Sequence, residues 1–260
     1  MYLAPRSLAE ALQQWQAHPD AVIVGGGTRV MALPLGERPE KLMDLAHAGL
    51  DVVQVGDASL AIGATASLAA LVDLPQPFGA LADAARSFRP DVVRRQASVG
   101  GNVAVGGSLV GALALLDAVL VLASATGSRR ENTDAPFVQN HEIAEKVLIG
   151  AQPIGQVSGR LAIRRTALGP AVCAVNLALW LQDGVVWARA VVQSAAPALV
   201  RLSARPLVTP QALAAAVVAA VTGPQHDKRA SGDYRRAMAG VLTERLALQL
   251  RQTLLPDAAS

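Results

Sequence analysis

Three consecutive glycines, Gly25, Gly26 and Gly27, follow an aliphatic run in the stretch VIVGGGTRVM, residues 22–31. An aliphatic run of this kind is typical of a buried strand. Glycine at the end of a strand either permits a sharp turn or lets another group come very close to the backbone. We therefore expect a strand that ends at these glycines. Either the chain turns sharply there, or another group packs closely against the glycine backbone.

Two familiar nucleotide-binding motifs do not fit this stretch. A dinucleotide fingerprint places a third glycine three residues after the second and opens a long helix there. Val30 holds that position, and Pro34 and Gly36 follow soon after. A Walker loop needs a lysine before the hydroxyl of Thr28, where Gly27 stands. The amides of consecutive turn residues can nevertheless form an anion-binding concavity, to which the Thr28 hydroxyl would add a donor.

A second glycine-rich stretch, RRQASVGGNVAVGGS, contains Ser98, Gly100, Gly101 and Asn102. We interpret it as a loop with the same ingredients: a hydroxyl, two glycines and a donor amide. Two such loops on different strands could supply donors to both phosphates of a pyrophosphate. The alternative for each stretch alone is a tight turn that binds nothing.

The apolar composition points to a permanent partner. Hydrophobic residues make up 52% of the 260 residues and charged residues only 17%. Either a membrane span or a buried interface would explain this excess. The most apolar run, residues 108–125, carries Asp117 in its middle and barely reaches spanning length. It predicts a buried helix followed by a buried strand, so we expect no membrane span and a partner on an apolar surface.

Other functional classes are disfavoured by composition. The net charge of +3 is dispersed and aromatic residues make up only 3%, which argues against a nucleic-acid surface. One cysteine and four scattered histidines offer no metal-ligand spacing. The N-terminus has no apolar signal core, so we expect a cytoplasmic protein.

Local patterns predict the order of the elements. Ser7 and Glu10 form a capping-box pattern before a helix, and a second helix is expected near Ser67. The polar residues 127–142 predict a long exposed loop and a domain boundary. Three strands with the turn Gln-Asp-Gly are expected after it. The remaining helices are predicted at 78–88, from Thr209 onward, and at 231–255.

Several of these segments together resemble a known family. VGGGTRVMALPLGERPEKLMDL, LAIGATASLAAL, RRQASVGGN, LLDAVLVLA and DYRRAMAGVLTERL occur in one order over nearly the whole chain. They are similar to the FAD-binding medium subunit of the molybdenum hydroxylases, the xanthine dehydrogenase, carbon monoxide dehydrogenase and aldehyde oxidoreductase family. The pair of glycine stretches about seventy residues apart is the specific part of this resemblance.

The resemblance implies an α+β fold in two parts. Residues 1–150 would form an FAD-binding domain of the vanillyl-alcohol-oxidase type, with subdomains of about 1–50 and 51–150. Residues 156–260 would form a smaller C-terminal domain of antiparallel sheet plus helices.

The resemblance also implies a set of FAD contacts. The first pyrophosphate loop would be Val24 to Val30, and the second would centre on Ser98 and Asn102. Phe88, Leu148 and Arg160 match an aromatic, a leucine and a cation near the flavin, although each is also an ordinary core or surface residue. The full set is Val24, Gly25, Gly26, Gly27, Thr28, Arg29, Val30, Phe88, Ser98, Gly100, Gly101, Asn102, Ser108, Leu148 and Arg160.

The chain departs from the family at two points. Arg29 replaces a frequent aspartate, and the segment after Asn102 is shorter and lacks a proline and an aspartate. Ser108 would replace that acceptor, or the contact is lost. The alternative to a working flavin subunit is thus a non-catalytic scaffold of the same fold with a degenerate flavin site.

The functional expectation follows from the family mechanism. Electrons would pass from a molybdenum cofactor through iron–sulfur clusters, both on partner subunits, to FAD on this chain and then to an external acceptor. The partners would be an iron–sulfur small subunit and a molybdenum-cofactor large subunit, in a heterotrimer or a dimer of heterotrimers. We expect no catalytic acid or base and no metal on this chain, and FAD held without a covalent bond.

Overall fold

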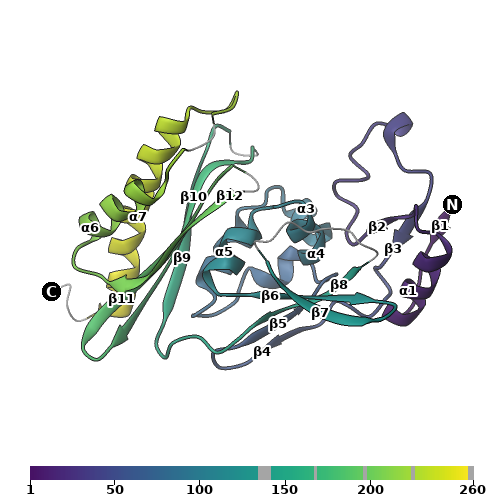
Figure 1. Ribbon diagram of the computed structural model, residues 1–260, viewed down its shortest axis with the longest axis horizontal. Coiled ribbons are helices and arrows are strands. Elements are labelled where there is room, and N and C mark those ends of the chain that lie inside the picture. Colours follow the sequence, from purple (N-terminus) through teal and green to yellow (C-terminus); the bar gives the residue numbers. More distant parts are fainter. Residues whose placement is uncertain (134–141, 167–168, 196–197, 224–225, 257–260) are drawn as a thin grey trace.

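The computed structural model describes residues 1–133, 142–166, 169–195, 198–223 and 226–256. Three β-sheets follow one another along the molecule in chain order (Figure 1). Helices cover one side of the first two sheets, whereas the C-terminal sheet has helices against both faces. Each sheet has its own cluster of buried apolar side chains. The α+β expectation is confirmed.

The N-terminal sheet contains three short parallel strands in the order β1-β3-β2. The Ser7 hydroxyl accepts a hydrogen bond from the Glu10 amide at 3.1 Å, and the Glu10 carboxylate accepts one from the Arg6 amide at 2.7 Å. The predicted capping residues therefore do start a helix. The elements are β1 (Tyr2–Leu3), α1 (Leu8–Ala17), β2 (Val22–Val24), η1 (Leu35–Glu37) and β3 (Leu42–Asp44).

The middle sheet has five antiparallel strands in the order β4-β5-β8-β6-β7. The strands are β4 (Val53–Val55), β5 (Leu60–Gly63), β6 (Val119–Ser124), β7 (Gly127–Asn132) and β8 (Ile143–Ile149). The helices are η2 (Leu68–Leu71), α2 (Gly79–Arg86), α3 (Asp91–Gln96), α4 (Val99–Ala104) and α5 (Leu109–Leu115). The apolar run 108–125 is thus the buried helix and strand that its pattern predicts.

Two expectations for this region are corrected. Residues 127–142 are not one exposed loop between domains, because β7 pairs with β6 and β8 returns to the same sheet. β7 is an edge strand of this sheet. Charged and polar side chains are common on edge strands, which explains why its sequence looks like a loop. Residues 134–141 lie outside the described residues. The helix expected near Ser67 is only the short 3₁₀ turn η2.

The C-terminal sheet has four antiparallel strands in the order β12-β11-β10-β9, with two helices packed on it. Asp183 and Gly184, with φ of 50° and 74°, form the predicted hairpin turn. The strand β12 was not expected from the sequence. The elements are β9 (Val157–Arg164), β10 (Ala171–Gln182), β11 (Val185–Ala195), β12 (Ala198–Pro206), α6 (Pro210–Ala220) and α7 (Gly232–Leu254).

A buried arginine fixes α7 to this sheet. Arg235 is fully buried and donates hydrogen bonds to the carbonyl oxygens of Val172 and Ser194. It also donates to the Asp227 carboxylate at 2.6 Å. The Asp227 carboxylate accepts several hydrogen bonds, and the one from the Arg229 amide has the largest effect. Together they hold the pKa of Asp227 well below its usual range.

Residues of β9, of α2 and of the segment just before α2 join the middle region to the C-terminal sheet. The side-chain amide of Gln76 donates to the Ser158 carbonyl at 3.0 Å and accepts from the Ser158 amide at 2.8 Å. The Ser158 hydroxyl caps the Ala80 amide at 3.0 Å. Because these bonds are buried or half-buried, they hold β9 at a fixed position beside α2. The division into domains at residues 150 and 156 stays a prediction.

No helix in the described part of the chain is both long and apolar enough to cross a lipid bilayer. The longest, α7, carries charged residues along its length.

Candidate functional site

The two glycine stretches lie against each other. A Cβ added to Gly25 would lie 2.4 Å from the Ser98 Oγ, and one added to Gly26 would lie 1.6 Å from the Gln96 carbonyl oxygen. Gly27 has φ of +69°, a left-handed conformation that favours glycine. The first two glycines therefore permit a close approach, and the third permits the turn.

The first stretch presents a row of free backbone donors. No backbone amide from Gly25 to Val30 donates a hydrogen bond to a residue that the structure describes. The Met31 amide donates to the Gly27 carbonyl at 2.8 Å, which closes one helical turn after the glycines. Gly25, Gly26, Gly27 and Thr28 are half-buried. Unpaired amides at the start of a helical turn are suited to bind an anion.

The second stretch is not the loop that we expected. Ser98 is the N-cap of α4, and Gly100, Gly101 and Asn102 lie within this helix. The amides of Gly100, Gly101 and Asn102 donate to the Ala64 carbonyl (2.8 Å), the Ser98 hydroxyl (3.2 Å) and the Ser98 carbonyl (2.9 Å). These donors are already used inside the protein. The second stretch therefore packs behind the first stretch, and its glycines allow close packing with the residues around them.

Asn102 has a structural partner. Its side-chain oxygen accepts a hydrogen bond from the Leu109 amide at 3.0 Å, and the residue is only 5% exposed. A Cβ at Gly107 would lie 2.5 Å from this amide group. Asn102 thus holds the turn between α4 and α5. The resemblance instead assigns this residue to the cofactor.

A small cavity of about 80 Å³ lies between the two stretches. Gly25, Ser98 and Gly101 line it together with Thr65. The buried Thr65 hydroxyl has no hydrogen-bond partner among the described residues. Sequence reasoning missed Thr65, because an isolated threonine in a turn carries no pattern.

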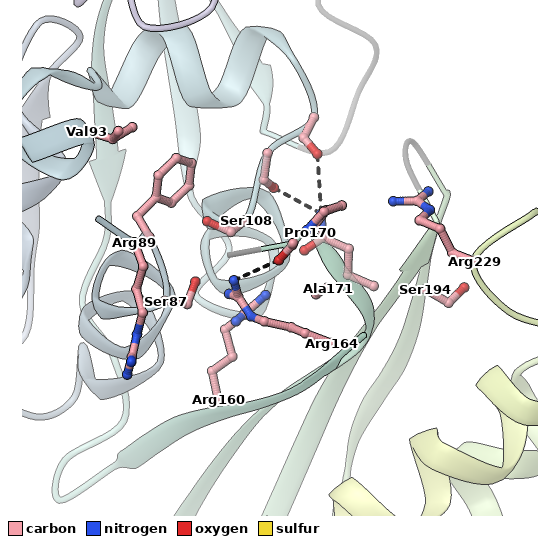
Figure 2. A pocket seen from close by; sticks show the side chains of 15 residues that line it. Ser87, Arg89, Val93, Ser108, Arg160, Arg164, Pro170, Ala171, Ser194 and Arg229 are labelled. Carbon is pink, nitrogen blue, oxygen red and sulfur yellow. Dashed lines mark hydrogen bonds between the residues drawn. The ribbon is translucent and has the colours of Figure 1, made fainter. Parts of the chain in front are cut away.

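A larger cavity of about 400 Å³ lies at the junction of the middle and C-terminal sheets (Figure 2). It brings together three of the predicted site residues, Phe88, Ser108 and Arg160. Ser108, the last residue of the second glycine stretch, therefore lies here rather than beside Gly25–Val30. We call this space the junction pocket; its lining is Ser87, Phe88, Arg89, Val93, Gly106, Gly107, Ser108, Arg160, Arg164, Gly169, Pro170, Ala171, Gln193, Ser194 and Arg229.

Helix α4 connects the two places. Gly100 and Gly101 near its start line the small cavity, and Gly106 and Gly107 just after its end line the junction pocket. Six helical residues rise about 9 Å, so the two cavities are separated by roughly the length of this helix.

The other predicted residues are distributed around these cavities without lining them. Val24 is buried at the end of β2, Val30 is half-buried and Arg29 is exposed. Leu148 lies on β8 between the buried Val147 and Ile149, pairs with Ala61 and Val119, and lines neither cavity.

A strand that ends in a row of free amides, with a second cavity one short helix away, is an arrangement in an α+β protein that suits a phosphate-bearing ligand. The model of the family described as "FAD binding domain in molybdopterin dehydrogenase" matches residues 1–151, more than half of the chain. The chain belongs to this family, whose cofactor is FAD. The family expected from the sequence resemblance is thus confirmed.

A curated relative agrees with this assignment. The nicotinate dehydrogenase FAD-subunit of Eubacterium barkeri is 30% identical over 140 residues, which cover 50% of this chain and 47% of the relative. The chain thus spans about half the length of the curated relative that it matches.

Solved structures share the fold along almost the whole chain. One is a carbon monoxide dehydrogenase from Hydrogenophaga pseudoflava that lacks the Mo-pyranopterin moiety of the molybdenum cofactor; the TM-score is 0.83 at 23% identity, with 95% of each chain covered. Another is quinoline 2-oxidoreductase from Pseudomonas putida 86; the TM-score is 0.82 at 22% identity, with 98% of this chain and 97% of the other covered.

Proposed function

We propose that this chain is the FAD-binding electron-transfer subunit of a molybdenum-containing hydroxylase or dehydrogenase complex. The observation that carries the proposal is the row of unpaired backbone amides from Gly25 to Val30. These donors fit the two negatively charged phosphates of FAD, and Gly27 leaves the approach to them free of a side chain.

Different residues would contact the pyrophosphate and the flavin end of FAD. The Gly25–Val30 amides and the Thr28 hydroxyl would hold the pyrophosphate, while α4 supports them from behind. Phe88 and Ser108, in the junction pocket, are the proposed contacts of the flavin end. When bound, FAD supplies the electron-transfer chemistry, and the protein's part is to bind it, orient it and limit its access to water.

The electron-transfer role rests on the family and on the relative named as an FAD-subunit. We propose that electrons arrive from an iron–sulfur small subunit and a molybdenum-cofactor large subunit, and leave to an external acceptor. A heterotrimer, single or doubled, fits the 52% hydrophobic content.

One observation favours a second candidate, a scaffold subunit with a degenerate flavin site. The amides of Gly100, Gly101 and Asn102 already have protein acceptors, so only one of the two stretches offers free donors. A scaffold would fold and assemble normally without retaining FAD.

A matched pair of glycine substitutions tests the proposal. Gly27 and Gly49 have φ of +69° and +73°, and a Cβ at either position meets nothing closer than 3.4 Å. Valine should therefore strain the backbone equally at both. Only Gly27→Val puts a side chain among the free amides.

The purified chain is titrated with FAD and the quenching of flavin fluorescence is followed. We expect the wild type and Gly49→Val to bind FAD, and Gly27→Val to lose affinity by roughly a hundredfold or more, since several charge-assisted hydrogen bonds are blocked. Equal binding by both variants would remove the glycine stretch from the site. A folded wild type that binds no FAD would favour the scaffold.

The attachment of the cofactor is tested separately. The only cysteine, Cys173, is fully buried in β10 and lines neither cavity. We propose that FAD is held without a covalent bond, so acid precipitation should release all of it. Flavin absorbance that stays in the washed precipitate would contradict this.

A further inference from the structure

A buried arginine in the junction pocket has no partner. Arg160 is 6% exposed, and its guanidinium makes no hydrogen bond or ion pair with any residue that the structure describes. The Nε atom is completely buried and unpaired. Burial, and then the neighbouring charge of Arg164, lower the pKa of Arg160 to about 10. Even so, the group is charged near neutral pH, and an unpaired buried charge is costly.

More positive charge surrounds Arg160. Arg164 lies two strand repeats further along β9, on the same face, and its only side-chain hydrogen bond to a described residue is to the Gly169 carbonyl at 3.0 Å. Arg89 also lines the pocket and forms no ion pair within the described part of the chain. Figure 2 shows the side chains of Arg160 and Arg164 next to each other, on the side of the pocket that holds Ser87.

The nearby carboxylates do not neutralise this charge. No aspartate or glutamate is among the described residues that line the pocket. The Asp83 carboxylate lies close enough to raise the pKa of Arg160, but it binds the backbone amide of Arg160 at 3.0 Å and the Arg86 side chain at 3.1 Å. Asp227 neutralises only Arg229, the fourth arginine of the lining, and the buried Arg235. Arg89, Arg160 and Arg164 therefore form no ion pair with a described carboxylate, and Asp83, which lines a neighbouring cavity with them, is the nearest negative charge.

We propose that Arg160, together with Arg164 and Arg89, binds the phosphate or carboxylate group of a small molecule other than FAD. The three arginines line a space of about 400 Å³ that Ser87 and Ser108 also line, and the side chains of Arg160 and Arg164 lie next to each other there. Arginine and hydroxyl donors are the usual partners of such oxyanions. This assigns Arg160 to a second ligand rather than to the cofactor.

The distance along α4 separates this site from the cofactor's phosphates. FAD has a single pyrophosphate, and the free amides of Gly25–Val30 are its proposed partner. The arginines line the pocket at the end of α4, and the small cavity beside Gly25 lies at its start. About the length of this helix, roughly 9 Å, therefore separates the two places. They share their pocket with Phe88 and Ser108, the proposed flavin contacts. On the proposed function, the occupant is then the external electron acceptor, and its class is an anion.

The test uses the full chain loaded with FAD and inorganic phosphate as the probe. Phosphate affinity is measured by calorimetry, with chloride at equal ionic strength as the reference. We expect Arg160→Gln to weaken phosphate binding by roughly tenfold to a hundredfold, the loss of one charge-assisted contact. Arg160→Lys should lose less. Arg205→Gln, at an exposed arginine of β12 with no hydrogen bond in the described structure, should stay within about twofold.

Thermal midpoints distinguish binding from a structural role. Arg160→Gln removes an unpaired buried charge, so its midpoint without phosphate should equal or exceed that of the wild type. A lowered midpoint with unchanged phosphate affinity would overturn the inference. Phosphate binding that disappears on FAD loading would also overturn it and return Arg160 to the cofactor. If the chain binds phosphate through Arg160 but no FAD, the proposed function fails and the anion site stands.

Discussion

The α-carbon of Gly26 faces the backbone carbonyl of Gln96, and an added Cβ would lie 1.6 Å from that oxygen. Real side chains do not occupy such a position, and a backbone carbonyl in a helix cannot rotate away. This contact explains the middle glycine of the triplet without a ligand. It also fixes the end of β2 against the segment between α3 and α4, which keeps the neighbouring amides in one arrangement.

We therefore expect Gly26→Ala to destabilise the fold, although alanine is the smallest possible addition. Overpacking of this kind costs typically about 1–3 kcal/mol, and a backbone contact belongs at the upper end. Urea unfolding followed by circular dichroism measures it. Gly36→Ala is the control, because nothing lies within 4 Å of a Cβ there. Equal stability of both variants would mean that the two segments are not in contact in solution.

Asn102→Ala should lower stability rather than simply weaken cofactor binding. It leaves the buried Leu109 amide without its acceptor, and an orphaned donor costs about 1–3 kcal/mol. Thermal unfolding of the apo chain is the measurement, with the exposed Asn132→Ala as control. An unchanged midpoint combined with weaker FAD binding would instead restore Asn102 as a donor to the cofactor.

The stability of the packing of α7 on the C-terminal sheet should depend on the charge of Asp227. Its pKa is lower in the folded chain than the unfolded value of about 4. A depressed pKa adds stability above the unfolded value, and this stability is lost as the pH falls through the folded value. Asp227→Asn should therefore unfold at a lower temperature than wild type at pH 7, and the difference should shrink below about pH 4. Asp73→Asn, at an exposed aspartate with no partner in the described structure, should change little at either pH.

The single thiol should be inert in the folded chain. Cys173 is fully buried, and desolvation raises its pKa to about 11. Because the thiolate is the reactive form, iodoacetamide at pH 8 should not label the native chain. After unfolding in guanidinium chloride, one thiol per chain should react. Rapid labelling without denaturant would show that β10 opens readily.

The sequence predicted the features that arise from local pattern. The Ser7 cap, the buried run 108–125 and the Asp183–Gly184 turn each follow from residues within one turn or strand. The two glycine stretches, about seventy residues apart, lie against each other, although no local signal links Gly26 to Gln96. Their joint binding of a pyrophosphate, expected from the sequence, stays a prediction.

The parts that could not be predicted depend on where distant residues meet. The side chains of Arg89, Arg160 and Arg164 look like dispersed surface charges in the sequence, and only the packing of β9 beside α2 gathers them. The helical state of Gly100 and Gly101 was missed because glycine disfavours helices in isolation. Here, the Ser98 cap and the close contact with Ala64 outweigh that preference.

The position of β8 sets the order in which the chain can complete its middle sheet during synthesis. This strand pairs with β5 on one side and β6 on the other, yet it follows both in the chain. Until residue 149 leaves the ribosome, the nascent chain carries two hairpin edges with unpaired backbone groups, the kind of surface on which other strands aggregate. Chaperone demand should therefore be greatest in the interval between the emergence of β6 and that of β8.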